Sequence, residues 1–138
     1  MLFIARLIVV CNIHYIGGVS ITDAIVDGLA QELRRGTFVL GELRLLKSPQ
    51  YGYSLVTLLK ERNLPIEAGT LYPLLRRLEE QGILASQWDV ESAKPRKYYS
   101  LSPTGQAVYV QLCAHWQELR TNIDAVIGDK EGIHATDQ

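Results

Sequence analysis

The 138-residue chain has few of the features that would assign it to a common functional class. Its two cysteines, Cys11 and Cys113, are too few and too far apart for a disulfide framework or a zinc site, which is typical of a reducing cytoplasm. Lysine and arginine number 14 against 15 aspartates and glutamates, so the formal net charge is -1. Because no overall positive charge attracts nucleic acid, any DNA-binding surface must be a local cluster.

The sequence also lacks recognisable catalytic groups. No glycine-rich phosphate loop occurs, and no Ser/His/Asp or Cys/His set has a supporting context. Cys113 and His115 are two residues apart, a spacing that places them on different faces of a helix. The sequence therefore predicts a protein that is not an enzyme and needs no cofactor or metal. A metal site that combines Cys113 and His115 from two copies is the alternative.

The first 18 residues form an apolar run that is broken by polar side chains. The run is shorter than the roughly 20 apolar residues of a membrane-spanning helix, and it lacks the basic start of a signal peptide. We interpret residues 1–19 as an N-terminal extension, either a short buried element or a stretch upstream of a natural start near Val19. Under this interpretation no membrane contact is expected. A membrane anchor in residues 1–16 is the alternative.

After residue 20, apolar residues recur at steps of three and four, which predicts helices. The first predicted helix spans residues 23–46, with a break or bend at Gly36. The second spans residues 54–63. Pro49 and Gly52 indicate a turn between the two helices.

The third predicted helix contains the sequence GTLYPLLRRLEEQGIL (residues 69–84). Proline is tolerated only near a helix start, so Pro73 places that start near Glu67. Thr70 and Tyr72 then lie near the helix N-terminus, where hydroxyl and free N–H groups favour a phosphate. The expected buried stripe consists of Leu71, Leu74, Leu75 and Leu78.

Two arginines and two glutamates follow in this helix. Arg76 and Arg77 lie beyond the first turns, where they can contact DNA, and Glu79 and Glu80 are expected to face away or to pair locally. The alternatives are that the arginines belong to a solvated helix face and that Tyr72 is a half-buried core aromatic.

Two short segments with strand character, residues 83–90 and 98–101, flank a basic polar connection, which predicts a β-hairpin. Lys94, Arg96 and Lys97 should make its tip basic. Because neighbouring residues of a strand face opposite sides, one tyrosine of the pair 98–99 is expected in the core. Trp88 is expected to pack against the hairpin or the first helix.

A last helix is predicted after the hairpin. Ser102 is a suitable N-cap, Pro103 fits the first helical position, and Gly128 is a suitable stop. The fold class is therefore mainly α with a small β-hairpin. Three helices followed by a hairpin form a winged helix-turn-helix, in which the third helix enters the major groove and the hairpin lies on the DNA backbone.

The sequence also resembles the PadR family of bacterial transcriptional regulators. The resemblance covers roughly residues 30–127 and depends on GTLYPLLRRLEEQGIL followed by KPRKYYSLSPTG (residues 94–105). It implies a dimeric, DNA-binding repressor that responds to a ligand or to stress. The family often has serine at the position of Glu67, so the usual N-cap is weaker in this chain.

The resemblance assigns residues 70–73 to the recognition-helix motif and residues 95–99 to the wing motif. Together with the basic residues nearby, these motifs define a candidate DNA-binding set. The set consists of Thr70, Tyr72, Pro73, Arg76, Arg77, Lys94, Arg96 and Lys97.

The last helix carries two apolar series that each repeat every seven residues, as in a coiled coil. They are Tyr109, Trp116 and Ile123, and Leu112, Leu119 and Val126. The stripe can pack against the first helix of the same chain, but the resemblance favours a homodimer formed through this helix. Trp116 is then a candidate wall for an aromatic or hydrophobic effector, or simply part of the interface core.

The sequence thus predicts a cytoplasmic homodimer that binds a two-fold-symmetric operator in double-stranded DNA. Residues 20–102 are expected to form the DNA-binding domain, residues 103–128 the dimerisation helix and residues 129–138 a tail. Two alternatives remain, a winged helix that binds protein without DNA contact and a membrane-attached sensor that uses residues 1–16.

Overall fold

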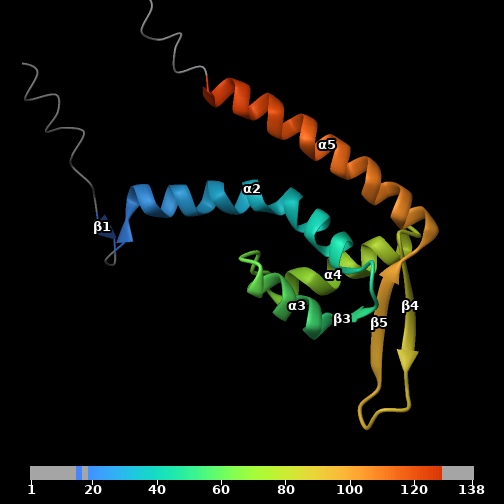
Figure 1. Ribbon diagram of the computed structural model, residues 1–138. Coiled ribbons are helices and arrows are strands. Elements are labelled where there is room, and N and C mark those ends of the chain that lie inside the picture. Colours follow the sequence, from blue (N-terminus) through green and yellow to red (C-terminus); the bar gives the residue numbers. More distant parts are fainter. Residues whose placement is uncertain (1–14, 17–18, 129–138) are drawn as a thin grey trace, which may run out of the picture. The chain divides into compact units, whose positions relative to one another are not determined.

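The computed structural model describes residues 15–16 and 19–128 (Figure 1). The predictions for residues 1–14 and for the tail lie outside this part of the chain. The chain divides into two compact units, Met1–Thr37 and Phe38–Gln138. In the first unit, β1 (Tyr15–Ile16) and β2 (Val19–Ser20) form a short antiparallel pair.

Helix α2 (Ile21–Leu45) follows β2 directly. It continues through Gly36, so of the predicted break or bend at this residue, a break is wrong. A single glycine costs about 1 kcal/mol relative to alanine within a helix, which a helix of 25 residues tolerates. Its first half exposes the apolar residues Ile25, Leu29 and Leu33, whereas Leu43 near its end is fully buried.

The predicted order of helices and hairpin is confirmed. After α2 come α3 (Gly52–Glu61), α4 (Ala68–Glu80), the hairpin strands β4 (Leu84–Asp89) and β5 (Arg96–Leu101), and α5 (Pro103–Gly128). The core of the second unit is a cluster of aliphatic side chains from α2, α3, α4 and β4, closed by one tyrosine from β5. Its members are Leu43, Leu46, Leu55, Leu59, Ile66, Leu71, Leu75, Leu78, Leu84 and Tyr99.

A third strand completes the sheet. The sequence interpretation treated residues 47–53 as a turn, but β3 (Gln50–Tyr51) pairs antiparallel with β5, giving the order β3-β5-β4. A strand of two residues is too short to show an alternating pattern, so periodicity could not reveal it. Tyr99 is buried and Tyr98 is half-buried, which confirms the prediction that one of the two tyrosines lies in the core.

Helix α4 starts at Ala68, with Glu67 as the N-cap residue, as Pro73 predicted. Within the described chain, the Glu67 side chain makes no capping hydrogen bond. The helix ends as Gly82 adopts a φ of 75°, and the Ile83 N–H donates to the Leu78 carbonyl at 2.9 Å. This left-handed turn brings the chain from α4 into β4.

Helix α5 begins with the predicted cap. The Ser102 hydroxyl accepts a hydrogen bond from the Gly105 N–H at 2.9 Å, and the Ser102 N–H donates to the Ile83 carbonyl at 3.0 Å. In the first half of the helix, Tyr109 and Leu112 pack against the core cluster. The second half is exposed from Trp116 onward.

Candidate nucleic-acid interface

Helix α4 has a buried side and an exposed side. Leu71, Leu75 and Leu78 are buried, and Leu74 is half-buried, because their spacing of three and four places them on one face. The candidate DNA-binding residues of this helix all lie on the exposed side. They are Thr70, Tyr72, Pro73, Arg76 and Arg77.

Tyr72 is neither a core residue nor a freely solvated one. Its side chain is 46% exposed, and it does not belong to the core cluster. Its ring lies against the backbone of Gly52, the first residue of α3. The hydroxyl end of the ring therefore lies beside Gly52, while about half of the side-chain surface is exposed.

The basic residues of the hairpin have different environments. Lys94 lies in the exposed connection between the strands, and Arg96 is exposed at the start of β5. Lys97 is half-buried within β5, so it does not belong to the exposed tip. The Arg96 guanidinium lies over the Tyr51 ring at 4.6 Å from the ring centre, which restricts the side chain while leaving its charge available.

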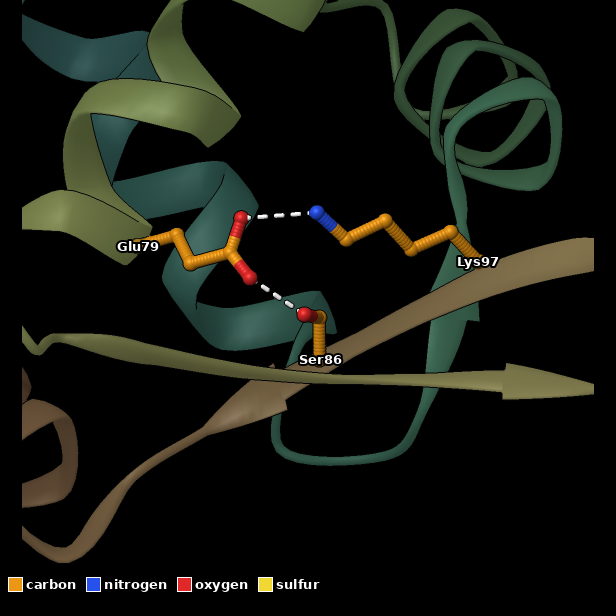
Figure 2. A network of polar contacts seen from close by, with 3 residues as sticks. All are labelled: Glu79, Ser86 and Lys97. Atoms are coloured by element: carbon orange, nitrogen blue, oxygen red, sulfur yellow. Dashed lines mark hydrogen bonds and ion pairs between the residues drawn. The ribbon is translucent and has the colours of Figure 1, made fainter.

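Lys97 is bound within the protein by a carboxylate of α4, that of Glu79 (Figure 2). Its Nζ donates to Glu79 Oε2 at 2.9 Å, and the Ser86 hydroxyl donates to Glu79 Oε1. Because Ser86 lies on β4 and Lys97 on β5, Glu79 connects α4 to both strands of the wing. The expectation that Glu79 faces away or pairs locally is wrong.

The hydrogen bonds of this network favour the charged forms of both Glu79 and Lys97. The hydrogen bonds from Ser86 and Lys97 lower the pKa of the Glu79 carboxyl, and the hydrogen bond to Glu79 raises the pKa of Lys97. Both side chains are about 30% exposed, so the pair contributes on the order of 1 kcal/mol or less to stability. Its main effect is geometric, since it fixes the wing against α4.

A buried carboxylic acid lies on α2. Glu42 of α2 is 0% exposed, and among the described residues neither of its carboxyl oxygens has a hydrogen-bond partner. Burial raises the pKa of Glu42 to about 8, although the positive charge of Arg77 opposes this shift. Sequence reasoning missed this group, because a glutamate beside apolar positions of a helix ordinarily faces solvent.

Trp88 does not pack as predicted, since it is 60% exposed on β4. Its register partner on β5 is Lys97. A shallow cavity of about 440 Å³ occupies the same region of the wing. Its lining consists of Pro49, Gln87, Trp88, Asp89, Val90, Glu91 and Tyr98.

The apolar stripe of α5 is only partly available to a second chain. Tyr109 and Leu112 contact the core of their own chain, whereas the later members of the stripe are exposed. These later members are Trp116, Leu119, Ile123 and Val126. Trp116 lies in this exposed part and does not line the cavity on the wing.

Membrane-spanning helices and metal sites are both absent from residues 15–16 and 19–128. In this part of the chain, no helix is both long and apolar enough to cross a lipid bilayer. No group of three or more histidine, cysteine, aspartate or glutamate side chains is placed there to hold a metal ion.

Comparison with known proteins agrees with this geometry. Residues 40–111 match the model of the transcriptional regulator PadR-like family. A crystal structure of a PadR family transcriptional regulator from Eggerthella lenta is 47% identical, with a TM-score of 0.74 over 77% of this chain and 95% of that one. A PadR-like transcription factor from Bacteroides fragilis is 33% identical, with a TM-score of 0.59 over 72% of this chain and 98% of that one.

A transcriptional regulator from Mycobacterium tuberculosis is 39% identical over 46 residues. The match covers 33% of this chain and 43% of that protein, so the chain spans less than half of this relative. The family match covers the helices and the hairpin that form the winged helix, and all three relatives are transcription factors or regulators. The chain belongs to the PadR-like family of transcriptional regulators, and its fold is a winged helix-turn-helix followed by a long C-terminal helix.

Proposed function

We propose that the protein is a homodimeric, cytoplasmic repressor that binds a two-fold-symmetric operator. Helix α4 enters the major groove and the β4–β5 wing lies on the phosphate backbone. The observation that carries the proposal is the exposed side of α4, which presents Tyr72 and Arg76 while Glu79 holds the basic wing against the same helix. Residues 20–102 form the DNA-binding domain in this proposal.

The second half of α5 supplies the dimer interface. Its stripe from Trp116 to Val126 is exposed in the single chain and follows the seven-residue spacing of paired helices. Two half-sites about one helical turn apart require two recognition helices at a fixed separation. A pair of α5 helices, residues 103–128, provides such a spacer.

Trp116 is the candidate contact for an effector. Its ring is partly exposed on α5, where a planar aromatic or hydrophobic ligand can stack on it. A ligand that binds one arrangement of the dimer more tightly shifts the population towards that arrangement and changes the separation of the recognition helices. The alternative role of Trp116 is that of a plain interface residue.

The direct test measures binding of the purified protein to the DNA upstream of its own gene, over a series of salt concentrations, with and without aromatic ligands. A specific complex that weakens steeply with salt is expected. The competing proposal, a winged helix that binds only protein, predicts no salt-dependent complex with this DNA.

The contribution of the wing is tested by single substitutions. Arg96→Ala should weaken binding to all DNA sequences and lower the log–log salt slope by about 0.9, which is the loss of one phosphate contact. Lys97→Ala should lower the slope less, because Glu79 already neutralises Lys97. Titrations of both variants by fluorescence anisotropy give the two slopes.

Lys94→Ala serves as a second tip variant, because Lys94 is exposed in the connection between the strands. Salt slopes of Arg96→Ala and Lys94→Ala that both equal the wild-type slope would show that the tip of the wing does not contact phosphates. A Lys97→Ala slope that falls as far as the Arg96→Ala slope would show that Lys97 leaves Glu79 when DNA binds.

A further inference from the structure

Gly52 and Tyr72 make an unusually close contact between α3 and α4. Gly52 is buried, although it is the first residue of α3. A Cβ atom at this position would lie 2.5 Å from both Cε1 and Cζ of Tyr72, which is too short for any real carbon–carbon contact. The far end of the Tyr72 ring therefore rests directly on the Gly52 backbone.

The local structure of α3 gives no reason for a glycine at position 52. Among the described glycines, only Gly82 has a positive φ. The backbone conformation at Gly52 is therefore one that residues other than glycine can also adopt. The start of α3 is held by other groups, since the Tyr51 N–H donates to the Ser54 hydroxyl at 3.1 Å. Alanine is a better helix former than glycine, so helix propensity alone would favour alanine. The contact with Tyr72 is the one that a Cβ atom at position 52 would crowd.

The contact also determines where the Tyr72 ring can lie. A tyrosine side chain has two rotatable bonds before its ring, and a ring that rests on backbone atoms has little freedom left. The remaining surface of Tyr72 is open, as its 46% exposure shows. Gly52 thus holds a rigid aromatic group at the exposed side of α4.

We propose that Gly52 is a positioning residue for DNA binding, acting through the orientation that it imposes on the Tyr72 ring and hydroxyl. This inference rests on the proposed function, because it takes the exposed side of α4 as the surface that meets DNA. Tyr72 contacts the DNA backbone and fixes the register of α4 in the groove. Gly52 itself need not touch the DNA.

The test is a double-substitution cycle with Gly52→Ala, Tyr72→Ala and the double variant, each measured for operator affinity. Both single variants should lose roughly tenfold in affinity, the effect of one hydrogen bond to a charged group. The double variant should bind like Tyr72→Ala, because Gly52→Ala then has no Tyr72 ring to displace. Melting temperatures should show that all three proteins are folded.

Gly36→Ala is the matched control, since Gly36 also lies within a helix and, in the described structure, has nothing within 4 Å of a Cβ atom. It should bind DNA like the wild type. Losses that add in the double variant would overturn the inference, as would wild-type affinity for Gly52→Ala. An unfolded Gly52→Ala protein would also overturn it, because the ring then could not move aside.

The failure of this inference is distinguishable from failure of the proposed function. If Tyr72→Ala keeps full affinity while Arg96→Ala lowers the salt slope, the protein binds DNA and the role of the Tyr72–Gly52 contact is rejected. If the wild-type protein shows no salt-dependent binding to its upstream DNA, the proposed function itself is rejected, and this inference with it.

Discussion

Leu119→Glu is expected to convert the protein into monomers. Leu119 is 53% exposed in the single chain and lies in the middle of the exposed stripe of α5. In the proposed dimer this position is covered by a second α5, so the substitution would bury an unpaired carboxylate there. Such burial costs several kcal/mol, and each 1.4 kcal/mol weakens association about tenfold.

Sedimentation gives the first measurement on this variant and a gel-shift assay the second. The monomer should lose most of its operator affinity, although every candidate DNA-binding residue is intact, because one recognition helix cannot span two half-sites. Gln117→Glu is the matched control, since it adds the same charge to an exposed position of α5 outside the stripe. It should remain dimeric.

A Leu119→Glu protein that remains dimeric would place the interface elsewhere. It would also remove Trp116 as a candidate for the effector site, because Trp116 would then not lie between two chains. The apolar residues exposed along the first half of α2 would become the next candidate interface. These residues include Ile25, Leu29 and Leu33.

Glu42→Met is expected to stabilise the protein and to remove a pH dependence of its stability. The folded-state pKa of Glu42 is raised to about 8 from an ordinary value of 4.5, mainly because the group is buried. Its protonated form is therefore favoured in the folded protein. The stability that protonated Glu42 contributes is fully present below pH 4.5 and is lost as the pH rises through about 8. The free energy of unfolding falls by on the order of 5 kcal/mol in total over this range.

Urea unfolding at pH 5, 7 and 9 measures this effect. The wild-type free energy of unfolding should fall across the series, whereas that of Glu42→Met should change less, with the largest gain at pH 9. Glu42→Gln separates charge from polarity, since its amide does not ionise but remains a buried polar group without a partner. Parallel pH profiles for the wild type and Glu42→Met would show that Glu42 reaches solvent or a partner in the native protein.

The helices could be predicted because each carries a strong local signal. The start of α4 was fixed by Pro73, since a ring without an N–H restricts where a helix can begin, and α5 was fixed by the cap at Ser102. The hairpin followed from two segments with strand character on either side of a basic polar connection. Strand β3 could not be found, because its pairing partner on β5 lies far along the chain.

Exposure along α4 could be predicted from the sequence, whereas the contacts between elements could not. The exposed side of α4 follows from helical periodicity, but the bond between Glu79 and Lys97 joins residues 18 positions apart. Nothing local in the sequence distinguishes Lys97, which is neutralised, from Arg96, which keeps its charge available. Burial of Glu42 and exposure of Trp88 both depend on which neighbouring elements cover them, and single-residue preferences do not report this.

The Glu79 bridge has a consequence for how an operator is read. Since it ties α4 to β4 and β5, α4 and the hairpin contact DNA in one mutual orientation in the proposed complex, as a single unit. In a dimer of the proposed kind, an effector then changes the distance between the two units of α4 and hairpin. The internal structure of each unit stays the same. One base pair inserted between the half-sites moves the second by about 3.4 Å along the helix axis and also rotates it around that axis. If paired α5 helices hold the separation of the two units fixed, the dimer cannot follow this displacement, and in the proposed dimer the spacing of the half-sites is as strict a determinant of recognition as their sequence.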